Sequence, residues 1–233
     1  YQMQDINIRN LVEQQLCVEI KKEVFSPFDL SKLPLFKVLI YEVLDSDYSI
    51  LLINQHHIVG DAYSYASVLL PELFQVYNSL LSNSNIDFEP LKIQYADFAV
   101  WQRKLLTEDK LSEQFSYWKH KLDGIEPINL PLDKPRPSQQ SYSGDSVSTK
   151  LDGKLSGQLR QLAKDHSVTM FMLMNAVFAI LLFRYSGQDD IVVGSPTANR
   201  HYPGTENIIG FFVNTLVIRT AIDPKHSFIQ LLE

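Results

Sequence analysis

The chain has 233 residues, 45% of them hydrophobic, and a formal net charge of −6 at pH 7. This composition can fill the core of one large domain or of two small ones. The 21 Lys and Arg residues are scattered, which argues against a surface that neutralises phosphates and so against nucleic acid as a partner. Cys17 is the only cysteine, which excludes an internal disulfide and a cysteine-based zinc or redox site, and we expect a reducing, cytoplasmic setting.

The apolar segments are too short to predict a membrane protein. The longest one, residues 170–183, contains Asn175 and falls short of the roughly 20 residues that a spanning helix needs, so we predict a buried core helix. The chain begins with neither a Met nor a targeting signal, and residues 227–233 look like the start of an interrupted helix. We therefore expect an internal fragment that is truncated at both ends.

Residues 35–55 predict a β-hairpin. Residues 35–44 alternate between apolar and polar side chains, and residues 48–55 form a more apolar run of strand length. The sequence Asp-Ser-Asp between the two runs is typical of a turn. An antiparallel pair follows, and its second strand ends immediately before His56 and His57.

The apolar period changes after Gly60. Apolar residues then recur at steps of three and four, which predicts an amphipathic helix that begins near Asp61 or Ser64. Pro71 lies inside this segment, so we expect a kink or a join there. A second helical segment is expected over residues 95–122.

Residues 130–144 predict a linker, because three prolines are followed by small polar residues. The elements expected after it are a strand near residues 147–151, an amphipathic helix around residues 155–162, a core helix over residues 167–183 closed by Ser186 and Gly187, and strands over residues 191–194 and 211–219. Strands and helices therefore alternate on both sides of the linker. This order predicts an α/β chain of two lobes.

His56 and His57 are the first candidates for chemistry. Neighbouring residues on a strand point to opposite faces, so the two imidazoles cannot easily bind one metal ion, and we predict no metal site. His57 is the better catalytic candidate, because Gly60 relaxes the backbone and lets Asp61 fold back and open the next helix. An imidazole near a helix N-terminus is favoured in the neutral form that a general base requires. The competing interpretation is an ordinary core histidine.

Asp61 has two interpretations. It is either a simple helix N-cap or a buried carboxylate, and a buried carboxylate needs a cationic partner. Arg200 is one candidate, since it follows a predicted strand and turn, although an arginine there can also be a solvated loop residue. The sequence contains no GxSxG, GxxxxGK[ST] or GxGxxG motif, so neither a hydrolase nucleophile nor a nucleotide site is indicated.

Four segments, in order and over nearly the whole chain, resemble signatures of the condensation domains of nonribosomal peptide synthetases. Residues 56–64 (HHIVGDAYS) are similar to HHxxxDG, residues 95–101 (YADFAVW) to YxDYAVW, residues 130–137 (LPLDKPRP) to LPTDRPRP, and residues 209–219 (IGFFVNTLVIR) to IGxFVNTxxxR. Residues 27–30 and 194–200 also match habits of that family. Together these segments identify the chain as a suspected member of it.

The resemblance implies a chloramphenicol-acetyltransferase-like fold, with two similar lobes in a V and a tunnel between them. On this pattern, residues 1–133 form the C-terminal part of the N-terminal lobe, which carries the HHxxxD motif. Residues 134–146 form the inter-lobe linker, and residues 147–233 form the first part of the C-terminal lobe.

The resemblance also implies an amide-forming acyltransferase. Donor and acceptor peptidyl carrier proteins would enter the tunnel from opposite sides, each with its substrate on a phosphopantetheine arm, and neighbouring synthetase domains such as adenylation domains would be further partners. No cofactor would bind directly to the chain. A thioester acyl or peptidyl group would pass to an amine, so the product is an amide.

The same resemblance assigns roles to individual residues. His57 would take the amine proton or hold the amine and the tetrahedral intermediate by hydrogen bonds, whereas His56 would orient the loop. Asp61 and Arg200 would pair across the lobes as structural partners. The residues expected at the substrate tunnel are Gly60, Ala62, Asn214 and Thr215.

Departures from the family pattern keep alternatives open. Ala62 replaces the usual glycine after the aspartate, and an alanine would be strained if that position required a positive φ. The remaining family segments lie outside the chain, so the fragment alone is not assured to be active. The alternatives are a catalytically degenerate module that recruits partner proteins and a stand-alone acyltransferase of the same fold. An epimerization domain is less favoured, because it typically has Gly-Val-Ser-Trp-Arg where residues 62–66 read AYSYA.

Overall fold

The computed structural model describes residues 7–11, 13–141 and 144–232. The chain forms two compact units, each described below by itself. Unit 1 contains residues 1–107 and 197–214, and unit 2 contains residues 108–196 and 215–233. The two units group residues by their contacts and do not test the lobe boundaries expected from the sequence. The division into residues 1–133, 134–146 and 147–233 therefore stays a prediction.

Unit 1 contains a three-stranded sheet in the order β1-β2-β3. Strand β2 (Phe36–Val43) pairs antiparallel with β3 (Ser49–Gln55), so the predicted hairpin is confirmed. Strand β1 (Asn7–Leu11) pairs parallel with β2 and was not predicted. Its sequence, NIRNL, does not alternate regularly between apolar and polar residues, so no strand period was visible.

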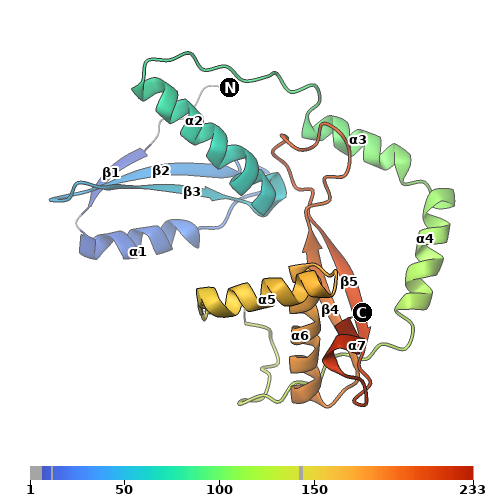
Figure 1. The fold of residues 1–233 in the computed structure, drawn as a ribbon. Helices are drawn as coiled ribbons and strands as arrows, with labels where there is room; N and C mark the ends of the chain where they lie inside the picture. Colours follow the sequence, from blue (N-terminus) through green and yellow to red (C-terminus); the bar gives the residue numbers. More distant parts are fainter. Residues whose placement is uncertain (1–6, 12, 142–143, 233) are drawn as a thin grey trace. The chain divides into compact units, whose positions relative to one another are not determined.

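One face of this sheet forms the core of unit 1. Leu39, Tyr41 and Val43 alternate along β2 and therefore point to the same side, where they pack against Leu16 of α1 (Glu13–Val24). Figure 1 shows α1 on one face of the sheet and α2 (Leu70–Leu81) on the other. The sheet thus lies between two helices. The histidine pair follows directly after β3, the last strand of this sheet.

The helix that follows the histidines has two parts. A π-helical segment, η2 (Ser64–Leu69), runs directly into α2, and the Leu70 amide donates to the Tyr65 carbonyl five residues earlier. Pro71 is the second residue of α2, so the change of helix type coincides with a residue that cannot donate a backbone hydrogen bond. The join expected at Pro71 is confirmed.

The single helical segment expected over residues 95–122 is two helices, α3 (Tyr95–Leu105) and α4 (Glu108–Lys121). Helix α3 begins with a capping box, in which the Gln94 amide donates to Asp97 Oδ2 at 2.8 Å. Its buried Phe98 packs with Ile208 and Phe212 of the returning segment. Helix α3 therefore holds residues 197–214 in unit 1.

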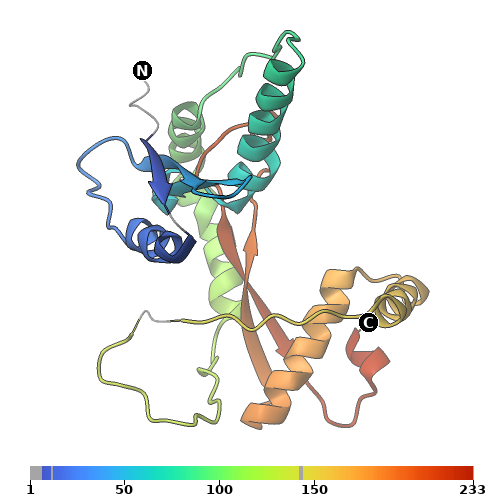
Figure 2. The ribbon, with the colours of Figure 1, turned by 90° about the vertical axis from the view of Figure 1, so that its left-hand side faces the viewer.

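Unit 2 contains α5 (Gly153–Asp165), α6 (Met170–Ser186), a two-stranded sheet of β4 (Asp190–Thr197) and β5 (Asn214–Ala221), and α7 (Phe228–Leu232). Figure 2 shows α6 alongside β4 and β5. The Thr169 hydroxyl caps the start of α6, and Gly187, at φ 72°, ends it, as the sequence predicted.

Three further expectations about elements were wrong. Residues 147–151 form no strand, and the side chain of Val147 is fully exposed, because no strand in the described part of the chain pairs with this run. Helix α6 buries only one side, and large side chains such as those of Phe171 and Tyr185 are exposed. The strand expected from residue 211 begins at Asn214, because the amides of Phe212 and Val213 are bound by a side chain instead of a neighbouring strand.

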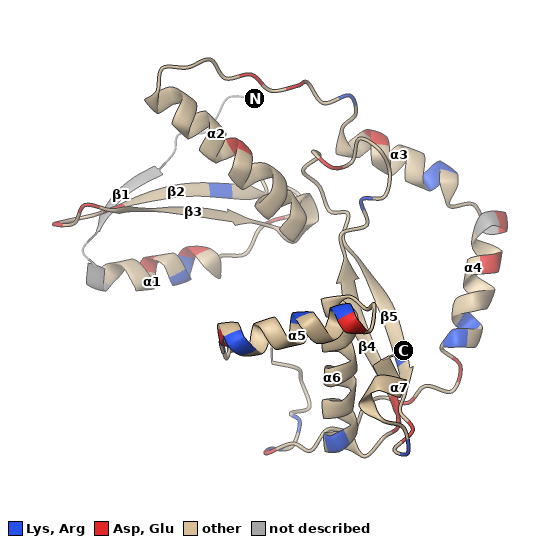
Figure 3. Cartoon of the chain, in the orientation of Figure 1, with Lys and Arg blue, Asp and Glu red and all other residues tan. Residues whose placement is uncertain are grey.

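Helices α1, α3 and α4 each carry charged residues of both signs (Figure 3); on α3, Asp97 lies in the first turn and Arg103 and Lys104 in the last. This distribution agrees with the scattered charges of the sequence and with a surface that is not built for phosphates. Among the helices that the structure describes, none alone is long and apolar enough to cross a membrane; α5 and α6 would reach that length and composition only together, and they meet at a bend of 104°.

Arg219 joins three segments of unit 2. Its Nε and Nη2 donate to the carboxylate of Asp190 in β4, with Nη2 2.7 Å from Oδ2, and its Nη1 donates at 2.9 Å to the carbonyls of Lys121 and Asp123 after α4. The Arg219 hydrogen bonds lower the pKa of Asp190 against the opposing effect of burial. Arg219 therefore fixes the end of α4 to the sheet.

We predict that Arg219→Lys loosens this joint, because an ammonium cannot make the forked contact with a carboxylate and two carbonyls at once. The variant should show faster amide exchange in residues 119–123 and a lower Tm than the wild type. Arg184→Lys, on the same unit but outside this contact, serves as the control. Unchanged exchange in both variants would mean that Arg219 does not hold α4.

Candidate functional site

The turn that carries the histidines is fixed at its start by His56. The His56 amide donates to the Leu35 carbonyl at 2.9 Å, which ends the β2–β3 ladder. The His56 Nδ1 accepts the Ile58 amide at 3.1 Å and so caps the short 3₁₀ helix η1 (His57–Val59). Since Nδ1 accepts, a neutral His56 carries its proton on Nε2. His56 thus contacts its own turn, in keeping with an orienting role.

His57 differs from its neighbour in its surroundings. Its side chain is exposed, and its ring meets the ring of Phe211 edge-on, with centroids 5.0 Å apart and an interplanar angle of 86°. The His56 ring instead contacts Phe28, at 6.3 Å. The described part of the chain contains no group of three or more His, Cys, Asp or Glu placed to hold a metal ion. An exposed imidazole is available to a substrate, whereas a core histidine is not.

Asp61 is buried, with 2% of its surface exposed, and both carboxylate oxygens are fully used. Oδ1 accepts the Ser64 amide and hydroxyl, each at 2.8 Å, which is the N-cap expected from the sequence. Oδ2 accepts the amides of Phe212 at 2.9 Å and Val213 at 3.1 Å. Asp61 therefore connects the start of the η2 helix to the segment that returns to unit 1.

Arg200 supplies the positive charge for this carboxylate. Its Nη2 lies 3.2 Å from Asp61 Oδ1 and donates to the Ser64 hydroxyl at 2.7 Å, and its Nη1 donates to the Ile208 carbonyl, also at 2.7 Å. The guanidinium carbon lies 4.1 Å from the centre of the Phe212 ring. Both charged groups belong to unit 1 and are nearly inaccessible to water. The solvated-loop interpretation of Arg200 is thus wrong.

The charge state of Asp61 follows from these contacts. Burial alone would raise its pKa, but hydrogen bonds from Ser64 and from the Phe212 amide, together with the charge of Arg200, outweigh burial and lower the pKa. The carboxylate is therefore ionised at neutral pH. A buried ion pair of this kind is stable because each partner is also hydrogen-bonded.

This pKa shift predicts a pH dependence of stability. A lowered pKa in the folded chain means that the unfolded chain binds the proton first, so the contribution of Asp61 is complete above the unfolded pKa of about 3.9 and is lost as the pH falls through the folded pKa. Urea unfolding between pH 6 and pH 3 should give a steeper loss for the wild type than for Asp61→Asn. Parallel curves would show that another group controls acid unfolding.

Gly60 does not use the conformational freedom of glycine, which corrects the expectation that it relaxes the turn. Its φ of −173° is extended, but a Cβ there would lie 2.6 Å from the Gln55 side-chain amide nitrogen. Ala62 is exposed, lies in the first helical turn and has no positive φ. The alanine in place of the family's glycine is therefore free of the strain that the sequence suggested.

Two of the other expected tunnel residues lie where β5 begins. Asn214 is its first residue and Thr215 its second, and both are exposed. The structure brings His56, His57, Asp61 and Arg200 together in unit 1. Their roles, and a tunnel lined by Gly60, Ala62, Asn214 and Thr215, stay predictions.

Three contributors to the site were missed from the sequence. Ser64 is 1% exposed, and its hydroxyl bonds with Asp61, Arg200 and the backbone of Gly210. The Tyr95 hydroxyl donates to the Phe211 carbonyl at 2.8 Å. The spacing Asp-x-x-Ser could have indicated Ser64 as the third residue of a capped helix, whereas no local signal marks Phe211.

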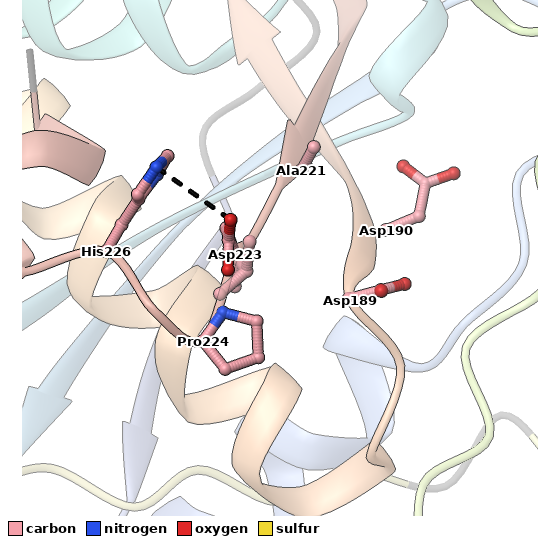
Figure 4. Close-up of a pocket in the computed structure, with 7 residues that line it drawn as sticks. Asp189, Asp190, Ala221, Asp223, Pro224 and His226 are labelled. Carbon is pink, nitrogen blue, oxygen red and sulfur yellow. Dashed lines mark ion pairs between the residues drawn. The ribbon is translucent and has the colours of Figure 1, made fainter.

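A separate cavity lies in unit 2. It measures about 440 Å³, and its lining residues are Asp189, Asp190, Ala221, Ile222, Asp223, Pro224 and His226. Figure 4 shows Asp189 and Asp190 on one side and Asp223 and His226 on the other. His226 Nε2 lies 3.8 Å from Asp223 Oδ2, and Asp190 binds Arg219. Because these groups are already engaged, the histidine turn is the better candidate site.

Known proteins resemble the chain in sequence and in fold. The family described as "Condensation domain" matches residues 1–233. One of the linear gramicidin synthase proteins of Brevibacillus parabrevis is 46% identical over 213 residues, which are 91% of this chain and 4% of that protein. Malpinin synthetase of Mortierella alpina is 40% identical over 231 residues, which are 98% of this chain and 3% of that protein. The chain therefore spans a small part of both relatives.

Solved structures add the fold. The first condensation domain of the CDA synthetase matches with a TM-score of 0.78 at 20% identity, over all of this chain and 52% of that one. The X-domain in a complex with OxyB from teicoplanin biosynthesis matches with a TM-score of 0.83 at 24% identity, over 98% of this chain and 51% of that one. The predicted α/β fold of the condensation-domain type is confirmed.

Proposed function

This chain belongs to the condensation-domain family, and from that premise we propose that it joins a carrier-bound acyl or peptidyl thioester to the amine of a carrier-bound aminoacyl group. One observation carries the proposal beyond the family. The exposed His57 lies on a turn that the His56 cap fixes at one end and the buried Asp61–Arg200 pair fixes at the other. An exposed imidazole on a turn that is fixed at both ends is held in one place, where it can accept a proton from a bound substrate.

The chemistry needs no covalent intermediate on the chain. A thioester is already activated, so the amine nitrogen attacks its carbonyl carbon, a C–N bond forms, the C–S bond breaks, and the thiol leaves with a proton. Holding two tethered substrates together supplies most of the acceleration. His57 then accepts the proton of the attacking amine or stabilises the tetrahedral intermediate by a hydrogen bond.

The supporting residues have structural roles in this proposal. Asp61 and Arg200 hold the turn, and His56 orients it. The tunnel residues are Gly60, Ala62, Asn214 and Thr215. No residue of the chain needs to bind a cofactor, because donor and acceptor peptidyl carrier proteins bring the substrates on phosphopantetheine arms, and adenylation domains load those carriers.

The alternative of a degenerate module depends on Ala62 alone. Since Ala62 sits unstrained in the first helical turn, the substitution gives no reason for lost activity. The solved X-domain in complex with OxyB shares the fold at 24% identity, and a likeness at that level supports neither catalysis nor partner binding in this chain.

The test is a reconstitution with the full-length polypeptide that contains this chain. Donor and acceptor carriers are loaded with separate acyl groups, and intact mass spectrometry follows the acceptor carrier. We expect its mass to increase by the acyl group, in a hydrolysis-resistant linkage. Carriers that bind with ordinary affinity but never yield product, for every pair tried, would contradict the proposal and favour the degenerate module.

A further inference from the structure

The ring of Phe211 lies directly beside the ring of His57. Their centroids are 5.0 Å apart at an interplanar angle of 86°, a favourable edge-to-face arrangement of two aromatic rings. Phe211 is 40% exposed, so its ring does not serve the core as that of its neighbour Phe212 does. It is an apolar side chain left partly in water next to the candidate base.

The backbone around Phe211 is fixed on both sides. Its own carbonyl accepts the Tyr95 hydroxyl at 2.8 Å, and the next amide, of Phe212, donates to Asp61 Oδ2 at 2.9 Å. Before it, the Gly210 amide donates to the Ser64 hydroxyl oxygen at 3.1 Å. A side chain at position 210 would overlap the Tyr95 ring, so the glycine is needed for this close packing.

Asp61 connects this segment to the histidine turn. It lies four positions after His57, and its carboxylate binds the two amides that follow Phe211. Both rings are therefore positioned from the same buried carboxylate. This arrangement explains how a loop residue 154 positions away in the chain can meet His57 reproducibly.

Phe211 provides the ring contact that the structure shows for the His57 side chain. No hydrogen bond to the His57 ring is present among residues 7–11, 13–141 and 144–232. In catalytic triads a carboxylate orients the histidine by a hydrogen bond. Here a perpendicular aromatic ring, with its centroid 5.0 Å from that of His57, is the group that contacts the imidazole.

The signature that residues 209–219 resemble, IGxFVNTxxxR, specifies the residues on both sides of Phe211 and leaves its own position open. The backbone bonds of residues 210–213 do not depend on the side chain at that position. A change at residue 211 can therefore alter what faces His57 without disturbing the segment that carries it.

We propose that Phe211 is a positioning residue that holds the His57 imidazole in its working orientation. The inference rests on the proposed function, because it assigns Phe211 a role toward the same reaction. Phe211 acts through His57 and takes no proton itself. Its contribution is the restriction of an exposed imidazole to one orientation before substrate arrives.

The kinetic test compares three variants of the full-length polypeptide. Phe211→Tyr keeps the ring, Phe211→Leu keeps an apolar side chain without a ring, and Phe211→Ala removes both. We expect Leu and Ala to lower kcat roughly two- to tenfold, the range of rotamer preference that an edge-to-face contact provides, with little change in KM for either carrier. Phe211→Tyr should restore kcat. A wild-type kcat in Phe211→Leu would overturn the inference.

A second measurement does not depend on turnover. In the full-length polypeptide with isotope-labelled histidine, NMR spectra of His57, assigned with His57→Ala, should show cross-ring contacts and a single side-chain rotamer in the wild type and in Phe211→Tyr. Phe211→Leu should show averaged rotamers; one retained rotamer would overturn the inference. A failure of the proposed function has a different signature, since His57→Ala would then leave amide formation unchanged whatever residue 211 is.

Discussion

Replacing Asp61 by Ala is expected to cost about 3–5 kcal/mol of unfolding free energy, because it leaves the buried charge of Arg200 without its partner. The amides of Phe212 and Val213 and the hydroxyl of Ser64 lose their acceptor at the same time. Domains are stable by only about 5–15 kcal/mol. Chemical unfolding followed by a probe in unit 1 measures the loss.

Asp97 provides the matched control for this prediction. It caps α3 in the same unit, accepts the Gln94 amide at 2.8 Å and is exposed, so Asp97→Ala should cost only about 1 kcal/mol. If the two variants lose the same stability, Asp61 is an ordinary cap and the buried pair with Arg200 contributes nothing. If the Asp61→Ala, Arg200→Met double variant regains much of the unfolding free energy lost in Asp61→Ala, the unpaired charge of Arg200 is the cause of the loss.

Replacing His57 by Ala is expected to reduce the rate of amide formation about 10²- to 10⁴-fold, the usual contribution of a positioned acid or base. Stability should hardly change, because the side chain is exposed and accepts no structural hydrogen bond among the described residues. The effect should appear in kcat, since His57 acts on the transition state and not on carrier binding. Steady-state kinetics with loaded carriers measure it.

His120→Ala is the control for general effects of losing a histidine. His120 lies on the exposed side of α4 and should keep the wild-type rate. His56→Ala should differ from both, because it removes the cap of η1 and lowers stability together with activity. If His57→Ala forms amide at the same rate as His120→Ala, His57 has no role in the reaction.

Local signals in the sequence predicted the elements that carry the site. The β2–β3 hairpin, the join at Pro71 and the end of α6 at Gly187 each depend on residues within a few positions of one another. Asp61 as a helix cap has the same local origin. These features follow from turn chemistry and periodicity, which a single sequence displays.

Features that depend on distant partners could not be read in this way. Residues 147–151 alternate like a strand, yet no strand among the described residues pairs with them. The contact of Phe211 with His57, and the bonds of Ser64 to Gly210, join positions about 150 residues apart. Arg200 was one candidate partner for Asp61 from the sequence, but composition alone favoured a solvated loop residue, and the resemblance to a family was needed to assign the pair.

The role of glycine at the turn shows a third limit. The sequence favours conformational freedom as the reason for Gly60, because that is the usual reason for a glycine in a turn. In the structure the Gly60 backbone is extended, a conformation that any residue adopts, and an added Cβ would meet only the end of the flexible Gln55 side chain. The sequence alone shows neither the backbone angle nor this neighbour.

A single-turnover experiment tests most directly whether the His57 turn performs the amide-forming step. Acyl-loaded donor carrier and aminoacyl-loaded acceptor carrier are mixed with the full-length polypeptide, and the masses of both carriers are followed in time. We predict that the wild type transfers the acyl group to the acceptor amine without acylating its own chain, while His57→Ala leaves the donor thioester intact. Equal transfer by both proteins, or an acyl group found on the polypeptide itself, would contradict this account.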